Sequence, residues 1–215
     1  MITFAHADNL FVLGLGDGDN RFNAETIGAI NDALDVVEAS EGPAALITMA
    51  EGKIWHNGLD LDYMATLGGD VGAFLASVER LYARLLTLRV PTIAAVQGHC
   101  FAGGAMFALA HDHRIMREDR GFFCLPEIDL GMSFTDGMAA LIAPRSRNRR
   151  CIGFAVGRPG WRANGPGAGR DRLDDHARFD RGRCSRTRKA LAPKAGNALV
   201  ALRQNFYGTT IATLS

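Results

Sequence analysis

Two short and wholly apolar runs constrain the fold of this chain more than any other feature. They occupy residues 44–50 (AALITMA) and 92–96 (TIAAV), and each follows a segment with helical periodicity. A strand without alternating polar residues is typical of a parallel sheet whose two faces are both covered. Strands that alternate with helices predict an α/β fold with right-handed crossover connections.

Helical patterns with clear start and stop signals surround the two runs. Asn23 is suited to cap a helix that reaches about residue 40, and Gly42-Pro43 ends it. Residues 71–89 carry one apolar stripe, so they predict an amphipathic helix that stops before Pro91. The remaining predicted elements are a strand over 2–15 with a hairpin or strand-exit turn at 16–19, short strands at 114–116 and 121–124, and helices at 103–110, 135–143 and 191–207.

The net charge of +1 hides a division of the chain into three parts. Residues 1–144 hold 19 acidic and eight basic residues, whereas residues 145–188 hold 13 arginines, seven glycines, four aspartates and no lysine or glutamate. Residues 189–215 hold three basic residues and no acidic ones. We therefore expect a folded core at 1–144, an anomalous Arg/Gly-rich segment at 145–188, and a C-terminal helix at 189–215.

Three hypotheses compete for the Arg/Gly-rich segment. It has no apolar period, which is typical of a solvated loop rather than a packed element. Arginine-rich stretches also attract phosphate, but the segment contains no recognisable binding module, so we expect no nucleic-acid partner. The third hypothesis is that a GC-rich gene is translated out of frame here. It predicts that renewed gene sequencing shows two compensating indels, near codons 145 and 189.

Targeting and redox features are sparse. No apolar run approaches about 18 residues, so we expect no membrane span. The N-terminus lacks a basic stretch followed by an apolar one, and the final ATLS is not an SKL-type signal, so we expect a cytoplasmic location. Four widely spaced cysteines without a CxxC pair are expected to be free thiols, and no His/Cys set has the spacing of a metal site.

Two loop segments that follow predicted strands offer backbone N–H groups that could bind a ligand. They are residues 52–64 (GKIWHNGLDLDYM) and 98–110 (GHCFAGGAMFALA), the second of which opens a helix with Gly103 and Gly104. Glycine lets a ligand approach the backbone, and a helix N-terminus leaves N–H donors free. Two such donors that converge would form an oxyanion hole, although glycine pairs at helix starts are more commonly packing devices.

A third segment, residues 121–131 (GFFCLPEIDLG), places Glu127 among apolar neighbours. A carboxylate in apolar surroundings has a raised pKa and is suited to move protons. The alternative is a loop carboxylate that caps a turn. Asp129 and Asp136 are the candidates for a second acid.

Together these segments resemble the crotonase family, the enoyl-CoA hydratases and isomerases. The runs GDGDNRFNAET, GKIWHNGLDL and HDHRIMREDRGFFCLPEIDLGM are most similar to the monofunctional Δ3-Δ2-enoyl-CoA isomerases. The resemblance covers residues 1–144, fails across 145–188 and resumes at 194–208 (KAGNALVALRQNFYG). It implies a spiral of ββα units with a C-terminal helical region, a homotrimer or dimer of trimers, and acyl-CoA thioester substrates without a further cofactor.

By position, the resemblance implies that the backbone N–H groups of Leu59 and Gly103 form the oxyanion hole. Family hydratases use two glutamates. Glu127 falls on the second position and Met106 on the first, and a double-bond shift needs only one base, so the resemblance favours an isomerase. The alternatives are an enoyl-CoA hydratase and an inactive acyl-CoA-binding subunit. The implied substrate contacts are Arg21, Phe22, Ala24, His56, Gly58, Asp60, Leu61, Gly104 and Met106. His56 either lines the cleft or makes ordinary polar contacts.

Overall fold

The structure is a computed structural model that describes residues 1–117, 121–127, 129–145, 177–178 and 181–215. Most of the Arg/Gly-rich segment therefore lies outside the described residues, and the three hypotheses about it stay predictions. None of the described helices is both long and apolar enough to cross a membrane.

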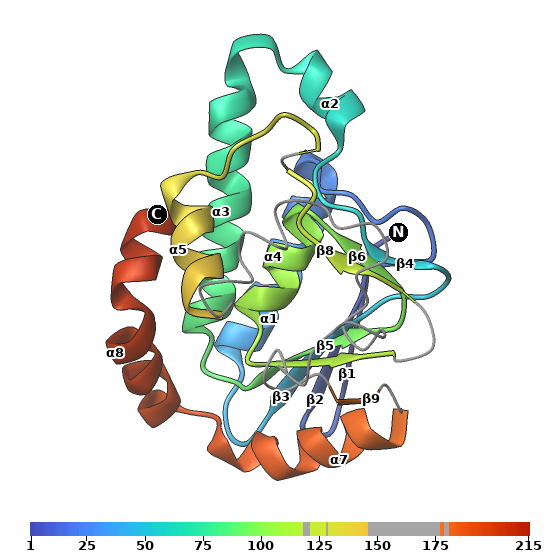
Figure 1. Ribbon diagram of the computed structural model, residues 1–215. Helices are drawn as coiled ribbons and strands as arrows, with labels where there is room; N and C mark the ends of the chain where they lie inside the picture. The colour runs from blue at the N-terminus through green and yellow to red at the C-terminus, as the bar shows by residue number, and fades with distance from the viewer. Residues whose placement is uncertain (118–120, 128, 146–176, 179–180) are drawn as a thin grey trace.

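The described strands form a large and a small sheet (Figure 1). In the large sheet the first pair is antiparallel and every later pair is parallel. Its strands, in spatial order, are β1 (Thr3–Ala7), β2 (Leu10–Gly14), β3 (Ala45–Met49), β5 (Thr92–Val96), β7 (His113–Met116) and β9 (Ala177–Arg178). The single strand predicted over 2–15 is wrong, because the chain reverses at Asp8, whose φ of +51° a short polar side chain tolerates.

The small sheet consists of three parallel strands, β4 (Ile54–His56), β6 (His99–Phe101) and β8 (Phe123–Cys124). Each follows a strand of the large sheet, and a helix comes after it, so the chain repeats a ββα unit. The helices are α2 (Leu61–Thr66), α3 (Val71–Thr87), α4 (Gly103–Ala110) and α5 (Asp136–Ile142), with short 3-10 turns at Gly68–Asp70 and Ala143–Arg145. This arrangement confirms the predicted α/β fold built from ββα units.

Helix α1 (Ala24–Ala39) begins where the sequence predicts. The Asn23 side chain accepts a hydrogen bond from the Thr26 N–H (2.9 Å), and the Thr26 hydroxyl accepts one from the Asn23 N–H (3.0 Å). This reciprocal pair satisfies two donors at the helix start. Helix α4 has no polar face, and all eight of its residues are buried between the small sheet and the surrounding helices. A helix that is apolar on every side is stable only inside the core.

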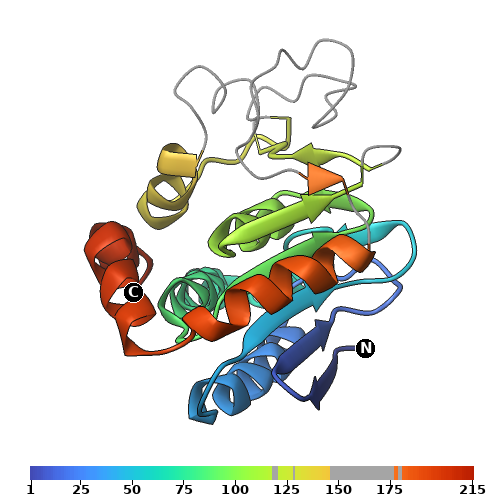
Figure 2. The ribbon, with the colours of Figure 1, turned by 90° about the horizontal axis from the view of Figure 1, so that it is seen from below.

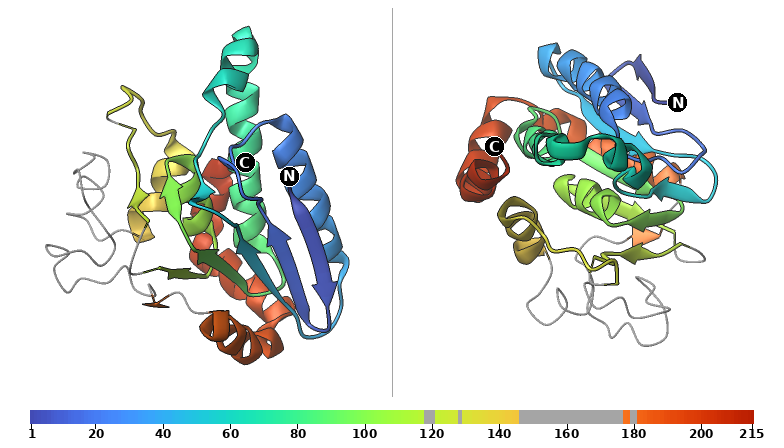
Figure 3. Two further views of the ribbon diagram at one scale, coloured as in Figure 1. Left: turned by 90° about the vertical axis from the view of Figure 1, so that its right-hand side faces the viewer. Right: turned by 90° about the horizontal axis from the view of Figure 1, so that it is seen from above.

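The C-terminal helix predicted over 191–207 is present, but its predicted start is wrong and it extends further. Instead, α7 (Arg181–Leu191) leads through a 3-10 turn (Ala192–Lys194) to α8 (Asn197–Leu214), and Gly196 breaks the path with a φ of +133°. Helix α7 crosses the boundary expected at 188/189 and lies against β3 and β5 (Figure 2), where Leu191 packs on the outer apolar residues of the large sheet. Helix α8 stands beside α3 and α5 (Figures 1 and 3).

One arginine fixes α8 to the core. Arg203 is 3% exposed and donates to the carbonyls of Leu88 and Val90, which precede β5. It also pairs with Asp112, whose carboxylate accepts the Thr92 N–H at 2.7 Å. Both terminal nitrogens of the guanidinium are paired, whereas the buried Nε has no partner among the described residues, so the buried charge is stabilised mainly by Asp112 and the two carbonyls.

Candidate active site

The small sheet places three candidate residues along one edge. Leu59 follows β4, Gly103 follows β6 and Glu127 follows β8, each two or three residues beyond the last residue of its strand. The strands are parallel, so their carboxyl ends meet at the same edge, where ligands of α/β proteins bind. Neighbouring strands lie about 4.8 Å apart, so these residues are brought together in the order of the strands.

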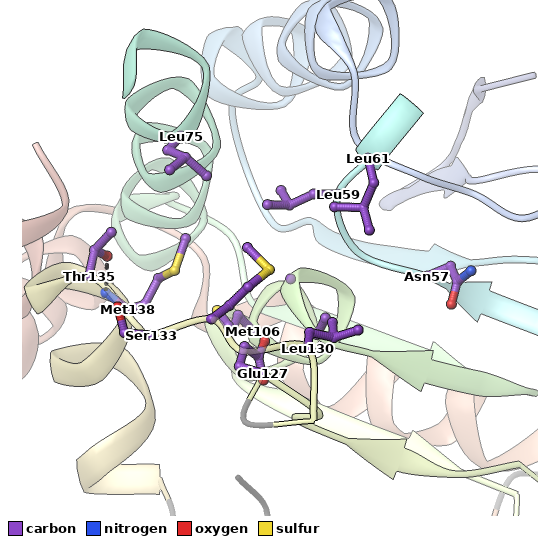
Figure 4. Close-up of a pocket in the computed structure, with 13 residues that line it drawn as sticks. Asn57, Leu59, Leu61, Leu75, Met106, Glu127, Leu130, Ser133, Thr135 and Met138 are labelled. Carbon is purple, nitrogen blue, oxygen red and sulfur yellow. Dashed lines mark hydrogen bonds between the residues drawn. The ribbon is translucent and has the colours of Figure 1, made fainter. Parts of the chain in front are cut away.

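A pocket with an empty volume of about 630 Å³, partly open to solvent, lies at this edge. Most of its lining is apolar. In the view of Figure 4, Asn57 is on one side and Thr135 on the other, with Met106 and Glu127 between them. The lining residues are Asn57, Leu59, Leu61, Leu75, Ala102, Gly103, Met106, Glu127, Leu130, Met132, Ser133, Thr135 and Met138.

The loop after β4 turns one amide away from its neighbours. The Phe22 N–H donates to the Gly58 carbonyl (2.8 Å), and the Asp60 N–H donates to the Phe22 carbonyl (2.9 Å). In a parallel ladder of this kind, the residue between the two bonded positions directs its own N–H to the opposite side. That residue is Leu59, and no described residue accepts a hydrogen bond from its N–H.

The second free amide begins helix α4. Gly103 is the first residue of the helix, so its N–H has no partner within the helix, and none is found among the other described residues. Ala102 precedes it with φ +49° and ψ −127°, a strained conformation for a residue with a side chain. The hydroxyl of the buried Tyr82 donates to the Gly103 carbonyl at 2.8 Å. The backbone is therefore held on both sides of this amide.

The two loops that carry these amides touch. Gly58 has a φ of +82°, and a Cβ at its position would lie 3.1 Å from the Gly103 nitrogen and 3.0 Å from the Ala102 side chain. Glycine is required here both by the left-handed backbone and by the close approach. Leu59 and Gly103, the residues that carry the two amides, both line the pocket.

Glu127 lines the same pocket as a buried residue. Its side chain is 6% exposed, and Oε2 has no hydrogen-bond partner among the described residues. Burial disfavours the charged form and raises the pKa of Glu127 to about 7. A hydrogen bond from its own backbone N–H opposes this shift by lowering the pKa. The Glu127 carbonyl accepts bonds from the N–H groups of Leu130 (3.1 Å) and Met132 (2.8 Å), which fix the loop. At neutral pH the carboxyl group can both take up and release a proton.

No second carboxylate lines the pocket among the described residues. Met106 is buried against it, whereas Asp129 and Asp136, the predicted candidates for a second acid, are exposed and outside the lining. The structure adds a feature that the sequence analysis missed. The Thr135 hydroxyl, which lines the pocket and caps α5, donates to the carboxylate of Glu79, a residue of α3 outside the lining. A Thr before a helical run predicts a cap, but nothing in the sequence places that cap beside α3.

The structure brings only some of the predicted substrate-contact residues to the pocket. Leu61 and Met106 line it together with Leu59, Gly103 and Glu127. The predicted contacts outside the lining are Arg21, Phe22, Ala24, His56, Gly58, Asp60 and Gly104.

Several of these outer residues have other partners. Arg21 pairs with Asp19 at 2.8 Å, and Asp60 caps α2 by accepting the Tyr63 N–H. Phe22 is fully buried against the ring of His56, with 4.0 Å between ring centroids. The side chains of Phe22 and His56 are therefore packed in the core beneath the loop. No group of three potential metal ligands occurs among the described side chains.

Sequence comparisons place these features in a known family. A family model for enoyl-CoA hydratase/isomerase matches residues 12–151. The chain is 40% identical over 150 residues to enoyl-CoA delta isomerase 2, peroxisomal, of Arabidopsis thaliana, covering 66% of this chain and 62% of that protein. It is 36% identical over 151 residues to enoyl-CoA delta isomerase 3 of the same plant, covering 67% and 63%. The chain thus spans about three fifths of the length of these relatives.

Solved structures agree on the fold. An enoyl-CoA hydratase/isomerase family protein from Pseudomonas syringae superposes with a TM-score of 0.85 at 24% identity, covering 99% of this chain and 93% of that one. An enoyl-CoA hydratase from Mycobacterium marinum gives a TM-score of 0.83 at 20% identity, covering 99% and 94%. At these identities the likeness concerns the fold alone.

Proposed function

The chain belongs to the enoyl-CoA hydratase/isomerase family, and from this premise we propose that it is a Δ3-Δ2-enoyl-CoA isomerase. One observation carries the proposal. Of the described residues that line the pocket, Glu127 alone has a carboxylate, and Met106 occupies the position where family hydratases are expected to have another. Shifting a double bond needs one base, whereas adding water is helped by two.

The proposed reaction begins with Glu127 as a general base. Its carboxylate removes a proton from C2 of a 3-enoyl-CoA, the C2–H electron pair forms a C1–C2 double bond, and the carbonyl π pair moves onto the thioester oxygen, which gives a dienolate conjugated with the C3–C4 double bond. The resulting dienolate then receives the same proton at C4, which leaves the double bond between C2 and C3. Atoms and charge balance without water, metal or redox cofactor.

The free amides of Leu59 and Gly103 suit the charge that develops on the thioester oxygen. Donors that are already in place stabilise such an oxyanion, and loss of one donor typically costs about 10²–10³-fold in rate. Their fixed loops support this role, because the donors need no rearrangement when the charge appears. A base with a pKa near the working pH is likewise suited to a reaction in which it first takes and then returns a proton.

The strand order gives the substrate a direction. The thioester oxygen would lie between the ends of β4 and β6, and the reacting carbons would lie beside Glu127 after β8. The acyl chain would then extend toward Leu75 and Met138, whose side chains make that part of the pocket apolar. The apolar lining supports the proposal, because it disfavours a bound water that could add to the double bond.

The experiment supplies 3-enoyl-CoA and 2-enoyl-CoA separately to the wild-type protein, to Glu127→Gln and to Asp129→Asn, an exposed carboxylate two residues away. We expect isomerisation of the 3-enoyl ester by the wild type and by Asp129→Asn. Glu127→Gln should lose turnover by about 10³-fold or more while it still binds the CoA ester, since it lacks the base. Faster formation of 3-hydroxyacyl-CoA than of the isomer would instead support a hydratase. Binding without turnover of either ester would support an inactive acyl-CoA-binding subunit.

Assembly and location also belong to the proposal. We expect a homotrimer or a dimer of trimers, and α8 exposes Leu202 (53%) and Phe206 (77%), which suits a covered position in an assembly. Sedimentation equilibrium would test this by a mass three or six times that of the chain. A cytoplasmic location stays a prediction, because two of the plant relatives carry the word peroxisomal in their names.

A further inference from the structure

His56, at the end of β4, is a buried imidazole that makes no contact with the pocket. Its side chain is 2% exposed, and its Nδ1 accepts a hydrogen bond from the Gly58 N–H at 3.1 Å. Burial lowers the pKa of His56 to about 3, so the ring is neutral and Nδ1 stays an acceptor at physiological pH. The hydrogen bond spans two residues, as in the turns that Asn and Asp side chains make.

This hydrogen bond completes the fixation of Gly58. The Gly58 carbonyl is already held by the Phe22 N–H, so both polar groups of the residue have a partner. The next amide along the chain, that of Leu59, then has one direction in which to point. Without the imidazole acceptor, the peptide plane that precedes Gly58 could rotate, and the direction of the Leu59 N–H would no longer be fixed.

The same histidine also supports the other amide. A Cβ at Gly104 would lie 2.6 Å from the His56 carbonyl oxygen and 2.8 Å from the His56 Cβ, so the first turn of α4 rests directly on His56. The ring packs on Phe22 and Phe107 with centroid distances of 4.0 and 5.8 Å. One side chain thus contacts both loops that carry the free amides.

We propose that His56 is a positioning residue that sets the Leu59 amide against the Gly103 amide through the hydrogen bond between its Nδ1 and the Gly58 N–H. The inference rests on the proposed function, because the two amides matter only if negative charge develops between them. It differs from a substrate contact, because the imidazole does not line the pocket. It also differs from simple core packing, because it depends on one acceptor atom at one place.

Three substitutions separate the acceptor from the packing. His56→Asn puts an oxygen near the place of Nδ1, His56→Gln puts its amide one bond farther out, and His56→Leu fills the space without an acceptor. We expect all three to lower the thermal midpoint because ring contacts are lost. Only Leu and Gln should lower kcat, by about 10–10²-fold with little change in KM, which is less than the loss of a complete donor. Asn should retain kcat within about threefold of the wild type, as two-residue turns with Asn predict.

A binding measurement tests the inference apart from turnover. Acetoacetyl-CoA forms an enolate with negative charge on its oxygens, whereas butyryl-CoA keeps a neutral thioester carbonyl. We expect the wild type and His56→Asn to prefer acetoacetyl-CoA at pH 8, and His56→Leu to lose most of that preference. Equal kcat and equal preference in the Leu and Asn variants would overturn the positioning role. If the wild type does not isomerise 3-enoyl-CoA, but His56→Leu loses the enolate preference and His56→Asn keeps it, the proposed function is overturned and the role of His56 is supported.

Discussion

Replacement of Glu127 by Gln should make the protein more stable at the pH where the wild type is most active. The carboxyl pKa is raised from 4.5 to about 7 in the folded chain because burial disfavours its charge. Between these pH values the folded state binds more protons at Glu127 than the unfolded state does. The free energy of unfolding therefore falls as pH rises through this window, by about 1.4 kcal/mol for each pH unit. Glutamine has no charge to lose, so the variant escapes this penalty.

The magnitude follows from the two pKa values. The variant should exceed the wild type by about 1 kcal/mol at pH 5 and by about 3 kcal/mol at pH 8. For a chain of this length, each kcal/mol corresponds to about 2–4 °C in the thermal midpoint, so the increase at pH 8 is about 6–12 °C. The kinetic counterpart is a wild-type kcat/KM that falls about tenfold for each pH unit below 7, because only the carboxylate acts as base.

Urea unfolding at both pH values measures the difference directly. Subtraction of the two proteins cancels other titrating groups, and Asp129→Asn serves as the matched control that changes an exposed carboxylate nearby. The control should show no comparable gain at pH 8. If Glu127→Gln is no more stable than the wild type at pH 8, the pocket does not desolvate this carboxyl group, and the reasoning that makes it a base poised near neutrality fails.

Two further substitutions test the backbone around the site and the attachment of α8. Ala102→Gly should raise the free energy of unfolding, measured in urea, by about 1 kcal/mol. Glycine relieves about 1–3 kcal/mol of strain at φ +49°, which is more than the conformational entropy that it adds to the unfolded chain. A loss of stability would show that the conformation of Ala102 is unstrained. Arg203→Met should cost about 3 kcal/mol, because it leaves the Asp112 charge and two carbonyls without their partner, and the double variant with Asp112→Asn should recover part of the thermal midpoint.

Local signals explain which elements the sequence predicts correctly. The buried strands at 45–49 and 92–96 need no information from distant residues, because an apolar run of that length is bounded by its own turns. The start of α1 is equally local, since Asn23 and Thr26 cap each other. The reversal at Asp8 and the break at Gly196 also carry local signals, Asp8-Asn9 and a glycine, that the prediction did not use. How the chain continues after them, with β1 paired to β2 and α8 beside α3, depends on distant contacts.

The candidate site is predicted in part for the same reason. Gly103 and Glu127 stand out because glycine at a helix start and a carboxylate among apolar residues are visible in the sequence. The orientation of His56 and Phe22 is not visible, because it depends on the bridge between Phe22 and Leu59, which joins segments far apart in the chain. The resemblance implies substrate contacts at both positions, which stays a prediction, and the structure adds that both side chains are buried in the core.

Two destabilising features of the described residues lie at one edge of the small sheet. The raised pKa of Glu127 marks a charge that folding disfavours, and Ala102 keeps a backbone conformation that costs about 1–3 kcal/mol. Neither improves packing, and both have simple remedies, a glutamine and a glycine. Both residues lie at the pocket. Ala102 precedes the free amide of Gly103, and Glu127 is the lone carboxylate among the described residues that line the pocket. Strain and unfavourable burial at a shared pocket are the features expected of a site shaped for chemistry.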